Sequence, residues 1–374
     1  MKTAKNRLLA RATQKASRVF ATSYRGATAR EPLFPILFQQ GLTEMLAGPV
    51  FRVLRTAALL GVCAAMGLGQ ELSEPSPAAG TSLQRSLPID EAKRLQLESA
   101  VRAHDYVQAE KLLEAEAMQN PKSQALLLSL ADVLFLDGKQ LNTVIVLKKA
   151  ELLGPLNESS RFLLALSYVS LGRKNLAIPE LEQLALSNPK SAVYPYWLSR
   201  LMYRKMDFEK ALKFAEKAVQ LDAAFPKAYD QLGLCYAGLG RNEDAILAYR
   251  NAMRLSDEKS LHWPWPSMNL GTLYLRLERL PEAEDTLRKS IAVEPSFPVS
   301  HFRLGQVLEK QGRISEATQE LLEACRLDPT YPEPHYALAR IFRRQNDTKS
   351  AEEQLTLFKR LRDADKQKGI TRPD

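Results

Sequence analysis

The chain has 374 residues, of which 45% are hydrophobic and 25% are charged, which is an ordinary composition for a folded protein with a large core. The three cysteines, Cys63, Cys235 and Cys325, show neither metal-ligand spacing nor a disulfide framework. The net charge of +9 lies mostly in residues 1–69, where ten Lys or Arg accompany two acidic residues. Because the rest of the chain carries only +1, we expect no nucleic-acid partner.

Residues 45–69 have the pattern of an export signal. Arg52 and Arg55 provide a basic flank, and the fourteen residues 56–69 contain no charge. This apolar run is shorter than the about 20 residues that a membrane-spanning helix needs, and small residues before Gln70 permit cleavage there. We therefore predict a signal peptide or a signal anchor, with residues 56–69 as a membrane tether if the segment is not cleaved.

Other interpretations of the leader remain open. Met45 is a second candidate start, which would make residues 1–44 a basic N-terminal extension that is not translated. Residues 1–30 contain no acid and are rich in Arg, Ala, Ser and Thr, which is also the composition of a transit peptide. Cys63 offers a lipoprotein signal, although Val62 is a poor residue before such a cysteine. The predicted location is exported, periplasmic or membrane-anchored, with mitochondrial import as the alternative.

The chain after the leader divides into a linker, a repeat region and a tail. Residues 70–89 are rich in Pro, Ser and Ala and predict a disordered linker. Residues 90–365 follow a 34-residue period that is broken only by an insertion at residues 260–263, and residues 366–374 form a flexible tail. The eight units begin at Asp90, Gln124, Glu158, Ala192, Pro226, Pro264, Pro298 and Pro332.

Within each unit, small and apolar residues recur at fixed positions. Position 20 is Ala in seven of the eight units, and position 8 is small in seven. Apolar residues at positions 4, 7, 8 and 11 line one face of a first helix, and those at 20, 24 and 27 or 28 line one face of a second. Gly or Asn at position 15 in five units favours the left-handed residue that ends a helix. Since no unit can bury its apolar stripe alone, the units are expected to stack around one continuous core.

This pattern resembles the tetratricopeptide repeat family, whose signature combines a Leu-Gly pair, alanines and aromatic residues. The unit at residues 226–259 matches it with Tyr229, Leu232, Gly233, Tyr236, Ala245, Tyr249 and Ala252. The resemblance covers residues 90–365 and implies an all-α, right-handed solenoid of about eight helix-turn-helix units. It also implies that a protein or peptide partner binds along a concave surface built from the first helices. Pro179 departs from the pattern, and we expect it to kink a second helix.

The chain carries no motif that indicates catalysis. The sequences GxxxxGK, GxGxxG, GxSxG and HExxH are all absent. His301 and His335 occupy position 4 of adjacent units, so they could form a stacked metal site, but this position lies in the helix seam and we expect both to be seam residues. We therefore predict a non-enzymatic protein without catalytic residues, cofactor or metal.

Positions 2, 5, 9, 12 and 13 of the first helices face the concave surface in the family. Here they combine aromatic side chains with arginine, which is typical of peptide grooves because arginine binds carboxylates with two hydrogen bonds. The predicted partner-binding residues are Tyr196, Arg200, Tyr203, Arg204, Trp265, Met268, Arg276, Phe302, Tyr336, Arg340, Arg343 and Arg344. The clamp with which some members hold a C-terminal carboxylate is absent, because its Lys and Asn positions are Asp230 and Leu234.

The insertion and its flank carry two tryptophans, Trp263 and Trp265, which either fill the wedge that the insertion opens or form a contact patch. Taken together, these patterns predict a scaffold or adaptor that mediates protein–protein interaction in the bacterial cell envelope. The alternatives are an organellar or cytosolic assembly factor and a regulatory subunit of a separately encoded enzyme.

Overall fold

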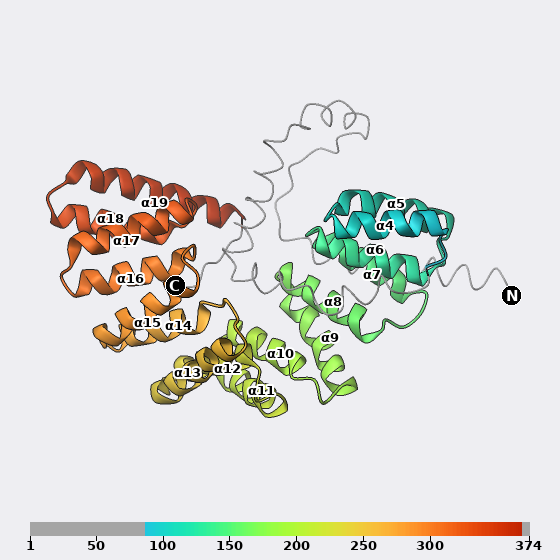
Figure 1. Cartoon of the computed structure of the whole chain (residues 1–374), viewed down its shortest axis with the longest axis horizontal. Helices are drawn as coiled ribbons and strands as arrows, with labels where there is room; N and C mark the ends of the chain where they lie inside the picture. Colours follow the sequence, from blue (N-terminus) through green and yellow to red (C-terminus); the bar gives the residue numbers. More distant parts are fainter. Residues whose placement is uncertain (1–86, 369–374) are drawn as a thin grey trace. The chain divides into compact units, whose positions relative to one another are not determined.

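The computed structural model describes residues 87–368, in which the chain forms sixteen α-helices and no strand (Figure 1). The helices pair in chain order into eight hairpins, so the predicted all-α solenoid is confirmed for these residues. The predictions for residues 1–44 and 45–69 fall outside the described residues.

Each hairpin consists of a first and a second helix. The first helices are α4 (Glu91–Arg102), α6 (Gln124–Leu136), α8 (Glu158–Ser170), α10 (Val193–Arg204), α12 (Pro226–Gly238), α14 (Trp265–Arg276), α16 (Pro298–Lys310) and α18 (Pro332–Arg344). The second helices are α5 (Tyr106–Gln119), α7 (Gln140–Glu151), α9 (Lys174–Ser187), α11 (Phe208–Leu221), α13 (Asn242–Glu258), α15 (Leu280–Val293), α17 (Ile314–Leu327) and α19 (Thr348–Lys368). Pro179 lies inside α9, which continues through it.

Every first helix ends in the same way. The residue at position 15 has a positive φ in all eight units, which is the left-handed conformation that turns the chain toward the second helix. Gly or Asn occupies this position in five units, as the sequence predicts, but His104, Met206 and Glu278 adopt it with φ values of 55°, 60° and 57°. The backbone therefore repeats in phase even in unit 1, where the sequence signature is weakest.

Small residues bring the two helices of each hairpin together. The eight residues at position 20, from Ala109 to Ala351, are at most 2% exposed. A Cβ added at Gly233 would lie 2.6 Å from the ring of Tyr249, which leaves no room for a methyl group. The predicted requirement for small side chains at positions 8 and 20 is thus confirmed, because the helices pack at close-packed density.

The insertion at residues 260–263 follows a longer second helix. Helix α13 has 17 residues, whereas α11 and α15 have 14 each. Trp265 then packs against the core of the C-terminal units, with its ring centroid 5.0 Å from that of Phe297. This contact places Trp265 against the N-cap residue of α16 in the following unit, and filling of the wedge by the two tryptophans stays a prediction.

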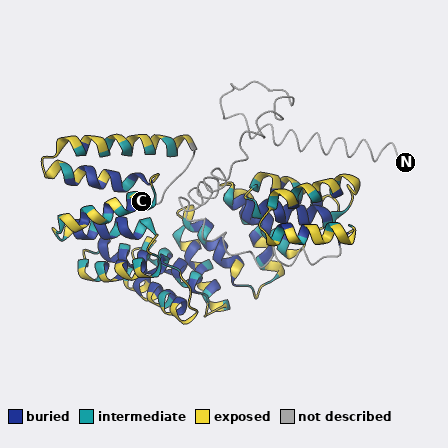
Figure 2. Ribbon diagram, turned by 45° about the horizontal axis from the view of Figure 1, so that its top comes forward, coloured by how far each residue is buried: buried dark blue, intermediate teal, exposed yellow. Residues whose placement is uncertain are grey.

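Successive hairpins pack in a defined order. Each second helix packs against the first helix of the next unit, and several first helices also contact the next first helix, as α10 and α12 do. Among residues 87–368, successive second helices lack comparably extensive contacts. The first helices therefore line the inner side of each pair of successive units, and the buried residues lie on the facing sides of the helices (Figure 2).

The packed region extends slightly beyond the predicted boundaries. Leu87 is 9% exposed and Ile89 packs against the core of the first unit, although both belong to the predicted linker 70–89. At the other end, α19 continues to Lys368, so the first residues of the predicted tail 366–374 are helical. The linker prediction is wrong for Leu87 and Ile89, because both side chains pack against the first unit. The tail prediction is wrong for residues 366–368, because they continue the last helix.

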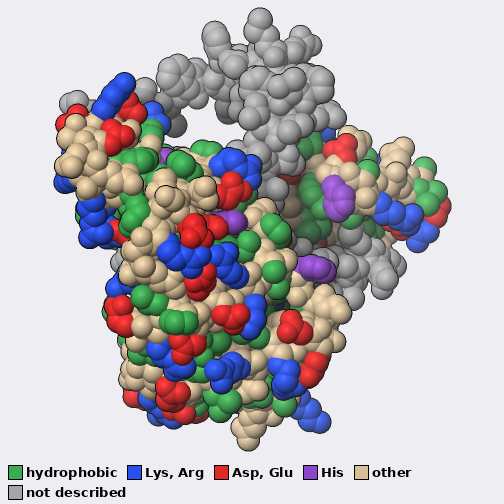
Figure 3. Space-filling model, turned by 60° about the vertical axis from the view of Figure 1, so that its left-hand side comes forward, with side chains coloured by type: hydrophobic (Ala, Val, Ile, Leu, Met, Phe, Trp, Pro, Cys, Tyr) green, Lys and Arg blue, Asp and Glu red, His purple; other side chains and the backbone are tan. Residues whose placement is uncertain are grey.

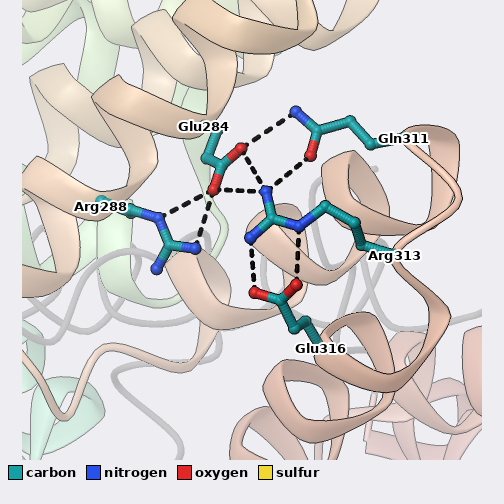
Figure 4. A network of polar contacts seen from close by, with 5 residues as sticks. All are labelled: Glu284, Arg288, Gln311, Arg313 and Glu316. Atoms are coloured by element: carbon teal, nitrogen blue, oxygen red, sulfur yellow. Dashed lines mark hydrogen bonds and ion pairs between the residues drawn. The ribbon is translucent and has the colours of Figure 1, made fainter.

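A polar network joins units 6 and 7 on the side of their second helices (Figure 4). Arg313, between α16 and α17, donates from Nη1 to both oxygens of Glu284 at 2.8 Å and pairs with Glu316. Arg288 and Gln311 also donate to Glu284, at 2.8 and 3.0 Å. Burial alone would raise the pKa of Glu284, but these hydrogen bonds outweigh it and lower the pKa to about 2. This carboxylate thus ties α15 to the next hairpin.

Candidate functional site

The twelve residues predicted to face a partner lie on the first helices, but they differ in exposure. Three are buried in the core: Tyr196, Met268 and Phe302. Three are half-buried: Arg200, Tyr203 and Trp265. Six are exposed: Arg204, Arg276, Tyr336, Arg340, Arg343 and Arg344.

The buried aromatic residues hold successive units together. The ring of Tyr196 lies 5.1 Å from that of Phe225, and the ring of Phe302 lies 5.3 Å from that of Tyr331. Phe225 and Tyr331 are the N-cap residues of the following first helices, and Met268 belongs to the same apolar core as Phe302 and Tyr331. The prediction that Tyr196, Met268 and Phe302 contact a partner is therefore wrong, because their side chains fill the interface between units.

Helix α18 presents the most exposed stripe on the first-helix side. Tyr336, Arg340, Arg343 and Arg344 follow the spacing i, i+4, i+7, i+8 and so share one helix face. Tyr336 is 51% exposed, and its ring lies 5.1 Å from that of Phe358 on α19. The stripe combines an accessible aromatic ring with three guanidinium groups, which is the composition of a surface that binds an anionic peptide.

Two of these arginines share a carboxylate with the preceding unit. Arg340 donates from Nε to Glu309 Oε1 at 3.1 Å and from Nη2 to Oε2, while Arg344 Nη1 lies 3.1 Å from Oε1. Glu309 on α16 is only 8% exposed, whereas the side chains of Arg340 and Arg344 are 47% and 66% exposed. The two arginines are therefore positioned by α16, and the group of three arginines and one glutamate keeps a net charge of +2.

Basic and acidic side chains are interspersed over the surface of the C-terminal units (Figure 3). Lys310 on α16 pairs with Glu278 at 2.6 Å, and Arg279 pairs with Glu282 at 2.8 Å. The guanidinium group of Arg343, in contrast, takes part in none of the side-chain hydrogen bonds or ion pairs among residues 87–368. Arg343 is therefore the arginine of this stripe whose charge is least committed to the fold.

The arginines of units 4 and 6 are also held by their surroundings. The guanidinium carbon of Arg200 lies 4.6 Å from the centroid of the Trp197 ring, so the cation stacks on an aromatic face. Arg276 Nη2 donates to the carbonyl oxygen of Ala237 and to Asn242 Oδ1, both at 3.2 Å. The contacts of Arg276 join units 5 and 6, whereas Arg200 stacks on a ring of its own helix.

Sequence reasoning missed a buried polar contact beside these arginines. Asn269 Nδ2 donates to both oxygens of Asp230, at 2.9 and 3.2 Å, and Asp230 is 7% exposed. Nearby, burial first and then the charges of Cys235 and Asp230 raise the pKa of Tyr203. Asp230 is the only acid at position 5 of the eight units, and five of the others carry Tyr, Phe or Met there, which was the sequence signal for this contact.

The two histidines at position 4 each pair, through Nδ1, with a side chain on the second helix of the same unit. His301 Nδ1 lies 2.7 Å from Glu320 Oε2, and His335 Nδ1 lies 2.7 Å from Gln354 Oε1. Burial alone would lower the pKa of His301, but the hydrogen bond with Glu320 outweighs it and raises the pKa. In the part of the chain that the structure describes, no group of three or more His, Cys, Asp or Glu could hold a metal ion.

Comparison with known proteins identifies the repeating unit. A family profile described as TPR repeat matches residues 310–346, and three described as tetratricopeptide repeat match residues 162–229, 226–259 and 264–289. The chain contains tetratricopeptide repeats. Two of the matched segments begin at residues 226 and 264, where the 34-residue frame starts units 5 and 6. Tetratricopeptide-repeat proteins are scaffolds for protein interaction.

Several tetratricopeptide-repeat proteins resemble this chain. The anaphase-promoting complex subunit CDC16 of Saccharomyces cerevisiae is 25% identical over half of this chain, a match that spans only 23% of the yeast protein. The crystal structure of a tetratricopeptide repeat protein from Parabacteroides merdae has a TM-score of 0.55 and 18% identity, with coverage of 72% of this chain and 98% of that one. The Cut9 and Hcn1 hetero-tetramer of the APC/C matches with a TM-score of 0.48, 22% identity, and coverage of 68% and 49%. The bacterial structure supports the fold assignment.

Proposed function

We propose that this chain is a protein-binding scaffold that holds an acidic, extended segment of a partner on the first-helix side of α18. The observation that carries the proposal is the exposed stripe of Tyr336, Arg340, Arg343 and Arg344. Its net charge of +2, with Glu309 included, attracts carboxylates, and Arg343 and Arg344 offer charge-assisted hydrogen bonds. Tyr336 adds an accessible ring for an apolar side chain of the same partner.

The rigid placement of the stripe favours this role. Arg340 and Arg344 are oriented by Glu309, so less side-chain freedom is lost when a partner binds. The yeast relative is named as a subunit of a multi-protein complex, and under our proposal this chain likewise works by joining other proteins. No chemical reaction is required of it.

The proposal can be tested with a fluorescent peptide rich in Asp and Glu. We expect the full chain to bind it in an anisotropy titration, and the affinity to fall as salt is added because exposed charges are screened. Arg343→Ala should weaken binding by about 1.5–3 kcal/mol, the range of hydrogen bonds to charged groups. Folding should change little, since Arg343 is exposed.

The matched control is Arg360→Ala on α19. Arg360 is also an exposed arginine of unit 8, but it lies on the second helix. If Arg360→Ala weakens binding as much as Arg343→Ala does, the attraction is a general charge effect and the proposed site is wrong. A lysine-rich peptide of equal length should not bind.

We also propose that the chain is exported to the cell envelope. The support is the charge-free run at residues 56–69 behind Arg52 and Arg55. Among residues 87–368, no helix combines the length and apolar character that crossing a membrane requires. N-terminal sequencing of the protein from bacterial cells should give Gln70, or a membrane-bound chain that begins near Met45. A cytosolic product that retains the first residue would contradict export.

A further inference from the structure

The outward face of the second helices changes character along the chain. Positions 18, 22, 25 and 29 follow helical spacing and are exposed in all eight units. In units 1–3 six of these twelve residues are large aliphatic side chains, whereas in units 4–8 only two of twenty are, Leu247 and Leu322. Solvent exposure does not explain this difference, because the same positions are exposed everywhere.

These six residues, together with Leu176 at the neighbouring position 19 of unit 3, define a surface that we call the outer apolar face. They are Val107, Met118, Leu141, Ile145, Leu152, Leu176 and Leu186. Position 29 shows the contrast most clearly, since Met118, Leu152 and Leu186 are 79%, 84% and 82% exposed. In units 4–8 the same position carries Gln220, Arg254, Ala292, Arg326 and Arg360.

The outer apolar face is large enough for a stable protein contact. Because the units stack in order, a given position recurs once on each of the second helices α5, α7 and α9, and these residues form a row across the three helices. With exposures from 50% to 84%, the seven residues present on the order of 800 Å², which is similar to the ~800 Å² per partner in a standard interface. Apolar patches beyond a few hundred Å² usually mark interaction sites.

The charges on this face favour contact with an identical surface. On the outward positions of units 1–3, Lys111 and Lys148 balance Glu114 and Glu182, so the net charge is zero. The same positions of units 4–8 carry seven basic and five acidic residues, a net charge of +2 that would repel a second copy. A lipid surface is not favoured, because membrane binding by exposed apolar residues usually adds a net positive charge. In a two-fold dimer the same surface of each copy meets itself, so this surface must be complementary to itself. An apolar face without net charge meets this requirement.

We propose that the chain forms a homodimer in which the outer apolar face of units 1–3 packs against the same face of a second copy. Helix α7 contributes Leu141, Ile145 and, at its end, Leu152, and so lies at the centre of the contact. The inner side of the stack remains free in both copies. The dimer would therefore present two copies of the α18 stripe without covering either.

The test is sedimentation of the purified full chain over a range of micromolar concentrations. We expect a dimer that added salt does not weaken, because the contact is apolar. Ile145→Glu should raise the dimer dissociation constant at least about tenfold, since it places an unpaired charge in the contact. Leu247→Glu is the matched control, because Leu247 occupies the same position 22 in unit 5 and is 62% exposed. This control should leave the dimer intact.

A cross-linking experiment provides an independent measurement. Leu141→Cys and Ile145→Cys should yield a disulfide-linked dimer on mild oxidation, and the unmodified chain shows the background from its own three cysteines. Leu322→Cys, on the outward face of unit 7, should not increase cross-linking. A wild-type chain that is monomeric throughout, or a dimer that Ile145→Glu leaves unchanged, would overturn the proposal. Equal helical circular dichroism spectra for Ile145→Glu and wild type would show that the variant is folded.

Discussion

Arg340 on α18 pairs through two nitrogens with the buried carboxylate of Glu309 on α16, and this contact joins the last two units. Nε lies 3.1 Å from Oε1, Nη2 donates to Oε2, and Arg344 also reaches Oε1. Arg340 thus has a structural role as well as a place on the proposed binding stripe. For this reason Arg343, rather than Arg340, separates binding from folding.

Replacing the shared carboxylate should affect stability and binding in opposite directions. We predict that Glu309→Gln lowers the free energy of unfolding by about 1–3 kcal/mol, because it removes charge-assisted hydrogen bonds to two arginines. The same change should strengthen binding of an acidic peptide, since the net charge of the stripe rises by one. Denaturant unfolding and peptide titration measure the two effects. Glu278→Gln, which removes the partner of Lys310 at an exposed site, should change stability by less than about 1 kcal/mol.

The network around Glu284 predicts loss of stability in acid. The pKa of Glu284 is about 2 in the folded protein, below its ordinary value of 4.5. Its contribution is therefore present above pH 4.5 and is lost as the pH falls from 4.5 toward 2. At most, this shift corresponds to about 3 kcal/mol. We expect Glu284→Gln to lower the free energy of unfolding at neutral pH. Between pH 4.5 and 2, the free energy of unfolding of the variant should fall less than that of the wild type. Parallel pH curves for variant and wild type would contradict the prediction.

The left-handed residues at position 15 offer a test of backbone strain. Met206 has φ 60° and is 76% exposed, so Met206→Gly should raise the free energy of unfolding by about 0.5–1 kcal/mol without losing core contacts. Conversely, Gly240→Ala should lower it by about 1–2 kcal/mol, although no atom lies within 4 Å of the added Cβ. Thermal or denaturant unfolding measures both changes. A fall in stability for Met206→Gly together with a rise for Gly240→Ala would show that backbone strain at positive φ does not determine the stability effect at position 15.

The seam between paired helices should not tolerate a larger residue. Ala245 is 0% exposed at position 20, and we predict that Ala245→Leu lowers the free energy of unfolding by about 1–3 kcal/mol through overpacking. Leu247→Ala, two residues away but 62% exposed, is the control and should change stability by less than about 0.5 kcal/mol. An unchanged melting curve for Ala245→Leu would contradict the assigned frame at that position.

The repeat pattern was sufficient to predict the fold, because the contacts that define each hairpin join residues close together in the sequence. Helical periodicity requires small residues such as Ala245 and Gly233 wherever two helices of one hairpin cross, and these positions could be assigned from spacing alone. The same spacing located the turn residues, although His104, Met206 and Glu278 carry no glycine signal. At these three positions the packing of the flanking helices imposes the left-handed conformation.

The candidate site depended on contacts between units, which spacing does not determine. The sequence placed Tyr196, Met268 and Phe302 on the same helix face as Arg343, yet the first three are buried and Arg343 is exposed. Whether a residue on that face is covered depends on how closely the next first helix approaches. The pairing of Glu309 with Arg340, 31 residues apart, likewise follows from the relative placement of two units. The sequence by itself thus determined the repeating hairpin, and the tertiary structure decided which of its side chains remain available to a partner.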